Sequence, residues 1–209
     1  MCFFNFFIDV RQPSCIVVRS GAEYWLNNVQ NKEQILIENC RKGKQRSEKL
    51  LYEHFFGYAM SIALRYSQNY EEAIEILNDS FIKVFKKIKD YNDYSFKGWL
   101  RRIVINTASD HYRKNKKHLY HKDIESQEAL TVIDTETVDD QISYDELLQA
   151  VQQLPPSYRN TFCMYVIDGY KHEEIAEMLN VSVGTSKSNL HRARACLREM
   201  ITRRDYAVA

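Results

Sequence analysis

The amino-acid sequence predicts an all-α protein: an N-terminal helical bundle and a C-terminal four-helix domain with a helix-turn-helix, joined by a flexible acidic linker. Three observations lead to this prediction. The 209 residues include only six glycines and three prolines, too few for a turn-rich β architecture. Apolar residues recur at helical spacing from Glu33 onward. One long acidic stretch of low apolar density interrupts that pattern.

The interruption divides the chain into four segments. We expect a disordered tail at 1–32, a first helical domain at 33–115, the acidic linker at 116–142 and a second helical domain at 143–204. A buried N-terminal strand is the alternative for the tail. Three apolar stripes mark the helices of the first domain: Leu50, Leu51, Phe55, Ala59, Ile62 and Tyr66; Ile74, Leu77, Phe81, Val84, Phe85 and Ile88; Leu100, Ile103, Val104, Ala108 and Tyr112.

Charge is segregated along the chain although the formal net charge is only +1. Residues 101–122 and the stretch from Lys187 onward are basic, whereas 123–146 are almost purely acidic. The five cysteines include no CxxC pair, which fits reduced thiols in a cytosol. The apolar opening MCFFNFFIDV is too short to span a bilayer and lacks the features of a secretion signal. We therefore expect a cytoplasmic protein without membrane insertion.

Residues 171–198 have the pattern of two short helices joined by a tight turn. Asn180 tolerates the left-handed turn conformation, and Ser182 is a good N-cap for the second helix. One face of that helix is expected to point inward: Val183, Ser186, Leu190, Ala193 and Leu197. The other face is short-chain polar and cationic, as in a helix that enters the major groove of DNA. The alternative is an ordinary helical hairpin with a solvated basic face.

Aromatic and cationic residues alternate before the third helix of the first domain. Stacking combined with phosphate attraction holds single-stranded nucleic acid, so the loop at 89–99 is a candidate strand-binding segment. We expect Tyr91 and Tyr94 to be exposed, and Phe96 and Trp99 to pack in the core. The following helix carries a polar stripe in which Asp110 lies one turn before Lys114 and is expected to orient it.

The sequence offers no catalytic constellation. His111, His118 and His121 are crowded by lysines and arginines, which disfavour a bound cation, and no carboxylate pair or cysteine cluster completes a metal site. No glycine-rich phosphate loop or Ser-His-Asp set is present in the sequence. We therefore expect a protein that is not an enzyme and uses no cofactor and no metal.

Three blocks together resemble a bacterial RNA polymerase sigma factor of the extracytoplasmic-function (ECF) group of the sigma-70 family. They are EEAIEILNDSFIKVFKKI at 71–88, FKGWLRRIVINTASDHYRKNKK at 96–117 and the stretch from Leu154 to Met200. The resemblance covers roughly residues 33–203 and implies promoter recognition, promoter melting and transcription initiation together with core RNA polymerase. Similar acidic linkers run through the active-site cleft of the polymerase.

The resemblance also implies roles for single residues. Those that bind the core polymerase would be Asn78, Asp79 and Lys83. Those that bind the −10 element as single-stranded DNA or at its duplex edge would be Tyr91, Asn92, Tyr94, Phe96, Asn106, Asp110, Arg113 and Lys114. Those that read the −35 element would be Gly184, Thr185, Lys187, Ser188, His191, Arg192 and Arg194.

The implied partners are promoter DNA and core polymerase, through the clamp helices of its largest subunit and the flap of its second-largest subunit. An anti-sigma factor is a further candidate partner. Two positions depart from the family pattern: Ser186 stands where relatives usually have Val, so its helix is expected to pack less firmly, and Tyr165 replaces a cationic residue. The rival hypothesis is a helix-turn-helix regulator that binds duplex DNA without core polymerase.

Overall fold

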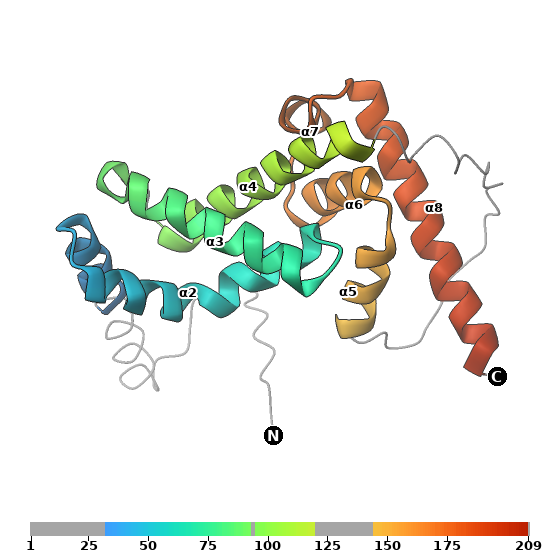
Figure 1. Cartoon of the computed structure of the whole chain (residues 1–209). Helices are drawn as coiled ribbons and strands as arrows, with labels where there is room; N and C mark the ends of the chain where they lie inside the picture. The colour runs from blue at the N-terminus through green and yellow to red at the C-terminus, as the bar shows by residue number, and fades with distance from the viewer. Residues whose placement is uncertain (1–31, 93–94, 120–143, 209) are drawn as a thin grey trace, which may run out of the picture.

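The computed structural model describes residues 32–92, 95–119 and 144–208, and these residues form helices and short connections without a strand (Figure 1). The prediction of an all-α protein is confirmed. The expected tail at 1–32 and acidic linker at 116–142 lie mostly outside the described residues. The helix that carries the third predicted stripe continues past residue 115, the expected end of the first domain, to Leu119.

The first unit contains a helix at residues 32–41, α2 (Gln45–Tyr66), α3 (Tyr70–Lys87), a short 3-10 turn η1 (Ile88–Asp90) and α4 (Phe96–Leu119). Helices α2, α3 and α4 pack against one another and bury the three predicted stripes, with Leu51, Val84 and Leu100 fully inaccessible to water. Leu50 is an exception because it is 43% exposed. Asn69 caps α3 by accepting a hydrogen bond from the Glu72 amide at 2.9 Å.

The second unit contains α5 (Tyr144–Gln153), α6 (Pro156–Phe162), a π-helical turn η2 (Cys163–Ile167), α7 (His172–Leu179) and α8 (Val183–Val208). Pro156 stands at the first position of α6, where its missing amide hydrogen costs nothing. The buried Arg159 guanidinium ties α6 to α5 because Nη1 donates to the Gln152 carbonyl at 2.8 Å.

The two units pack directly on each other. Helix α2 contacts α5 and α6, and α4 contacts α7. Figure 1 shows α5 and α6 beside the C-terminal end of α2, with α8 along the far edge. The buried apolar residues form one continuous cluster that includes Tyr66 and Val104 of the first unit and Leu154, Met164 and Ile175 of the second.

Replacing Phe81 with Ala is expected to lower the free energy of unfolding by about 3–5 kcal/mol, because the residue is only 2% exposed and its ring centroid lies 4.7 Å from that of Tyr52. The neighbouring Ile82 is 51% exposed, so Ile82→Ala should change stability by no more than about 0.5 kcal/mol. Urea denaturation followed by circular dichroism measures both values. Equal effects of the two variants would contradict the packing described for α3.

Candidate nucleic-acid interface

The helix-turn-helix expected at 171–198 is formed by α7 and α8. Asn180 adopts φ 52° and ψ 58°, the left-handed conformation predicted for the turn. The Val181 amide then donates to the Ala176 carbonyl at 3.0 Å and closes the end of α7. Ser182 caps α8, since its Oγ accepts the Thr185 amide hydrogen at 3.0 Å. The turn therefore holds α8 at a defined angle to α7.

Helix α8 presents the predicted faces. Ser186, Leu190, Ala193 and Leu197 are buried, and Val183 is half-buried. All seven residues expected to read the −35 element are exposed: Gly184, Thr185, Lys187, Ser188, His191, Arg192 and Arg194. Arg192 is also supported from α6, because its Nη1 donates to the Tyr158 hydroxyl at 3.2 Å. The sequence did not reveal Tyr158 because the contact joins residues 34 positions apart.

A polar contact replaces apolar packing beneath the recognition helix. The Ser186 hydroxyl lies 2.9 Å from His172 Nδ1, and the Tyr165 ring stacks on the His172 ring with centroids 4.5 Å apart. Ser186 is completely buried. The two positions that depart from the family pattern thus meet at one histidine, which joins the π-helical turn η2 to α7 and α8.

The residues expected to bind core polymerase lie on α3. Asn78 is exposed and accepts a hydrogen bond from the Tyr52 hydroxyl at 3.1 Å. The Asp79 side chain is 48% exposed, and its Oδ2 lies 2.7 Å from Nε2 of His111 on α4. Lys83 Nζ lies 2.7 Å from Asp110 Oδ2. The residues of α3 that are expected to bind core polymerase are therefore joined by polar contacts to α4, which carries residues expected to bind the −10 element.

Asp110 does not orient Lys114 as expected. Its carboxylate instead binds Lys83 across the helix pair and Arg113 on its own helix. Burial raises the pKa of Asp110, but the hydrogen bonds from Lys83 and Arg113 outweigh it and leave the pKa below its usual value. Asp110 thus stays ionised and positions two cations. Asn106, Arg113 and Lys114 are exposed along the same helix.

The aromatic loop is shorter and less exposed than the sequence suggests. Phe96 and Trp99 already belong to α4, and Phe96 is 5% exposed, so it cannot offer a free ring to a base. Tyr91 is half-buried, not exposed as expected, with its ring 5.0 Å from the Trp99 ring. Asn92 is exposed, and Tyr94 lies outside the described residues.

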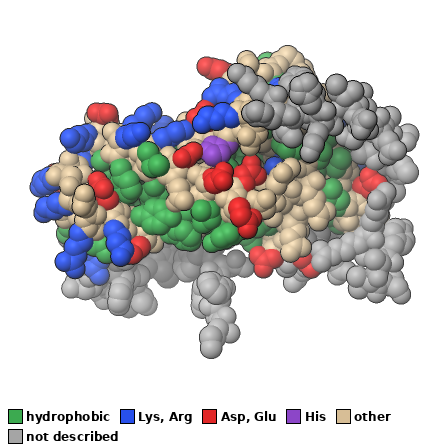
Figure 2. Space-filling view, in the orientation of Figure 1, with side chains coloured by type: hydrophobic (Ala, Val, Ile, Leu, Met, Phe, Trp, Pro, Cys, Tyr) green, Lys and Arg blue, Asp and Glu red, His purple; other side chains and the backbone are tan. Residues whose placement is uncertain are grey.

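Arg41 supports this loop, a role that the sequence pattern did not predict. Its Nε donates to the Ile88 carbonyl at 3.3 Å, its Nη2 donates to the Tyr91 carbonyl, and its guanidinium lies 5.6 Å from the centroid of the Tyr91 ring. Three exposed lysines precede the loop: Lys86 and Lys87 at the end of α3 and Lys89 in η1. Figure 2 shows Lys and Arg side chains gathered at this end of the molecule.

Among the described residues, no group of three or more His, Cys, Asp or Glu side chains could hold a metal ion. None of the described helices is both long and apolar enough to cross a membrane.

Two family models match the chain. Residues 51–118 match the model of sigma-70 region 2, and residues 144–197 match that of sigma-70 region 4. The ECF RNA polymerase sigma factor SigW of Bacillus subtilis is 30% identical over 176 residues, covering 79% of this chain and 94% of SigW. The RNA polymerase sigma-H factor of Pseudomonas aeruginosa is 27% identical, covering 80% of this chain and 93% of that factor.

Among solved structures, the sigma factor RpoE of Bartonella quintana, in complex with the anti-sigma factor NepR, matches with 21% identity and a TM-score of 0.46. The match covers 74% of this chain and 96% of RpoE.

Two helical units, one of which carries a helix-turn-helix with an exposed cationic face, are the architecture of a DNA-binding protein. The matched regions and relatives identify the particular family. The chain belongs to the ECF group of RNA polymerase sigma factors, and it functions as a sigma factor in transcription initiation.

His172 and Ser186 are expected to be energetically coupled. His172→Ala and Ser186→Ala should each lower the free energy of unfolding. The loss in the double variant should be smaller than the sum of the two single losses by about 0.5–1.5 kcal/mol, because each single change removes the same hydrogen bond. Thermal unfolding of the four proteins measures this coupling. Glu173→Ala, an exposed neighbour on α7, is the control and should show no coupling to Ser186. Strict additivity for His172 and Ser186 would contradict the contact.

Proposed function

We propose that the two units divide promoter recognition between them. The first domain, 33–115, binds core polymerase and the −10 element, and the second domain, 143–204, reads the −35 element, with 116–142 as the tether. The single observation that carries this proposal is the face of α8: the residues expected to contact DNA are all exposed, while Ser186, Leu190, Ala193 and Leu197 on the opposite face are buried. Such a face can enter a major groove without rearrangement of its own helix.

In the proposed DNA contact, the cations of α8 bind phosphates and base edges. Arg192 and Arg194 offer planar, forked donors, and Lys187 offers a point charge. A side chain added at Gly184 would meet only Ser182 Oγ at 3.7 Å, an ordinary contact. The packing of this chain therefore does not require glycine there, and close approach of the DNA backbone is the reason we propose for its presence.

For the first unit, we propose that Asp79 binds the clamp helices of the largest polymerase subunit, with Asn78 and Lys83 beside it. Support comes from geometry: His111 holds the carboxylate of Asp79 while almost half of that side chain stays open to solvent. Asn92, Asn106, Arg113 and Lys114 would then contact the −10 strand along α4 and the loop before it. Tyr91 would contribute through its partly exposed ring, and Phe96 by supporting that ring from below.

The proposed partners follow from this division. They are core polymerase, including the flap of its second-largest subunit, and promoter DNA. The exposed Tyr144 and Leu147 of α5 offer an apolar surface for the flap. An anti-sigma factor is a further proposed partner, since RpoE of Bartonella quintana was solved in complex with one. RNA synthesis itself would belong to the polymerase, and the cytoplasm is the proposed site of action.

Replacing Arg192 with Ala is expected to weaken binding of the holoenzyme to its −35 element by about 1–3 kcal/mol if the guanidinium reads a base. Tyr158→Phe is the matched control, because it removes the intramolecular hydrogen bond of Arg192 and keeps the charge. Footprinting over a range of salt concentrations measures the loss. Unchanged affinity for Arg192→Ala would show that α8 is not the reading helix.

Replacing Asp79 with Arg is expected to abolish co-purification with core polymerase and leave the helical content intact, because the side chain lies on the exposed face of α3. His111→Gln should weaken binding less, since it removes only the group that positions Asp79. Glu53→Arg, an exposed charge reversal on α2, is the control and should retain binding. Recovery of Asp79→Arg with core polymerase at normal yield would refute this assignment.

A protein that needs no polymerase would footprint a promoter by itself. The rival function, a duplex-binding regulator, therefore predicts equal protection with and without core polymerase, whereas a sigma factor requires it.

A further inference from the structure

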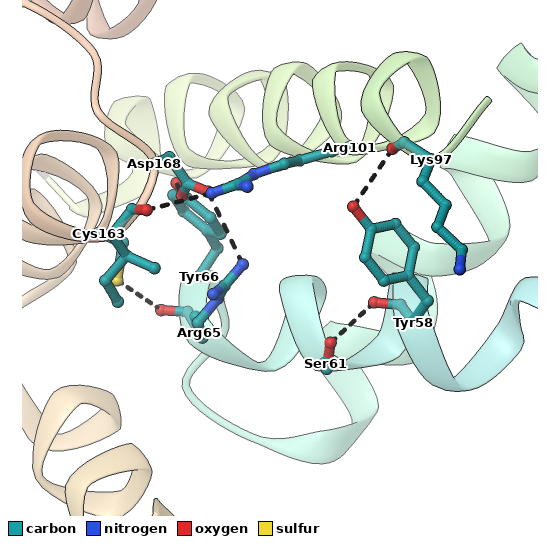
Figure 3. A network of polar contacts seen from close by, with 9 residues as sticks. Tyr58, Ser61, Arg65, Tyr66, Lys97, Arg101, Cys163 and Asp168 are labelled. Atoms are coloured by element: carbon teal, nitrogen blue, oxygen red, sulfur yellow. Dashed lines mark hydrogen bonds and ion pairs between the residues drawn. The ribbon is translucent and has the colours of Figure 1, made fainter. Parts of the chain in front are cut away.

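Asp168 is buried between the two units. It follows η2 in the second unit, and its side chain has no exposed area. Arg101 of α4 donates to Oδ1 from Nε at 2.8 Å and from Nη2, and the Tyr66 hydroxyl at the end of α2 donates to Oδ2. Nη2 of Arg65 lies 3.7 Å from Oδ1. Figure 3 shows these side chains converging on the carboxylate from two helices of the first unit.

The C-terminal end of α2 is also completed by the second unit. The last carbonyls of a helix have no partner within that helix. Here the Leu64 carbonyl accepts a hydrogen bond from Nε2 of Gln152 on α5 at 3.0 Å, and the Arg65 carbonyl accepts one from Sγ of Cys163 at 3.2 Å. Nη2 of Arg101 donates to the Ile167 carbonyl at 3.1 Å. The contacts therefore run in both directions between the units.

The polar groups at this junction are adapted to burial. Burial and the neighbouring Asp168 carboxylate raise the pKa of Tyr66, so its hydroxyl stays a donor. Burial raises the pKa of Cys163 to about 12, so its thiol stays neutral. The Asp168 carboxylate keeps its two arginine partners and the tyrosine hydroxyl only while the two units remain in contact, and water takes their place when the units separate.

This arrangement cannot serve both promoter elements at once. The position numbers of the −10 and −35 elements place their centres about 25 base pairs apart, which is about 85 Å at about 3.4 Å per base pair. Helix α4, which would face the first element, is packed against α7 of the helix-turn-helix that would face the second. The 24 residues between the described parts of α4 and α5 reach about 80 Å when fully extended. Because the two units themselves cover part of the distance between the elements, a tether of this length permits the separation that the contact between the units prevents.

We infer that Asp168 is an intramolecular latch that holds this sigma factor in a closed form, with its second unit docked on its first. Closure leaves the seven −35 residues of α8 exposed. Closure therefore does not mask α8, but it holds α8 too close to α4 for the two helices to reach both promoter elements at once. Only the open fraction of the protein can span a promoter. The latch therefore lowers the apparent affinity for a complete promoter in proportion to that fraction.

The latch is tested with the full chain by small-angle X-ray scattering. Asp168→Asn removes the charge and keeps the shape, and Tyr66→Phe removes one donor. Both should raise the radius of gyration by about 5 Å or more above that of the wild type, because a two-unit chain that opens is no longer compact. Asp145→Asn on α5 is the control for an exposed acid of the same unit and should scatter like the wild type. An unchanged radius for Asp168→Asn would overturn the latch.

Arg101→Gln covers the case in which a variant at the buried carboxylate fails to fold, because the Arg101 side chain is 38% exposed. It should open the protein, and adding Asp168→Asn should open it no further, since both changes break one contact. Circular dichroism checks that helical content is retained. A folded Arg101→Gln variant that remains as compact as the wild type would refute the proposal.

The regulatory part rests on the proposed function and has its own readout. At limiting sigma factor, Asp168→Asn should increase initiation with core polymerase on a complete promoter about tenfold or more, because the closed fraction is lost. Its affinity for a duplex with the −35 element alone should not change. Opening without increased initiation would refute inhibition by the latch. Initiation by neither the wild type nor the variant, with the scattering change intact, would instead refute the proposed promoter function.

Discussion

Packing on α2 is the constraint on which the rest of the structure depends. Its apolar face receives α3 and α4, and its C-terminal end receives α5 and α6. Leu51, Phe55 and Ala63 are buried completely or almost completely along this helix, and Tyr66 is buried at its end. One helix thus serves as the core of the first unit and as the docking site of the second. Apolar burial holds each unit together and continues between them, whereas directional polar contacts fix the orientation of the second unit on the first.

Features that repeat along one helix could be predicted from the sequence. The inward and outward faces of α8 follow from a 3.6-residue period, and the turn before it follows from the backbone preference of Asn180 and the capping chemistry of Ser182. The exposed position of Asp79, opposite Phe81 and Phe85, could be predicted in the same way.

Contacts between helices could not be predicted from a single sequence. The expected partner of Asp110 was Lys114, because neighbours four residues apart share a helix face, yet the carboxylate binds Lys83 from another helix. Arg41 beneath the aromatic loop, Tyr158 beside Arg192, and Asp168 with its partners all depend on tertiary packing. Sequence spacing carries no signal for such pairs, which lie from 27 residues apart for Lys83 and Asp110 to 102 residues apart for Tyr66 and Asp168.

The π-helical turn η2 has a consequence for how this family can vary. In this turn the Asp168 amide donates at 3.0 Å to the Cys163 carbonyl, five residues earlier, whereas an α-helical hydrogen bond would reach back only four residues. Loss of one residue from this turn would restore ordinary α-helical winding and rotate everything after it by about 100°. The aspartate would then point away from Arg101 and Tyr66. A single-codon insertion or deletion at this place would therefore be enough to gain or lose the docking of one domain on another, without any substitution in the DNA-reading surface.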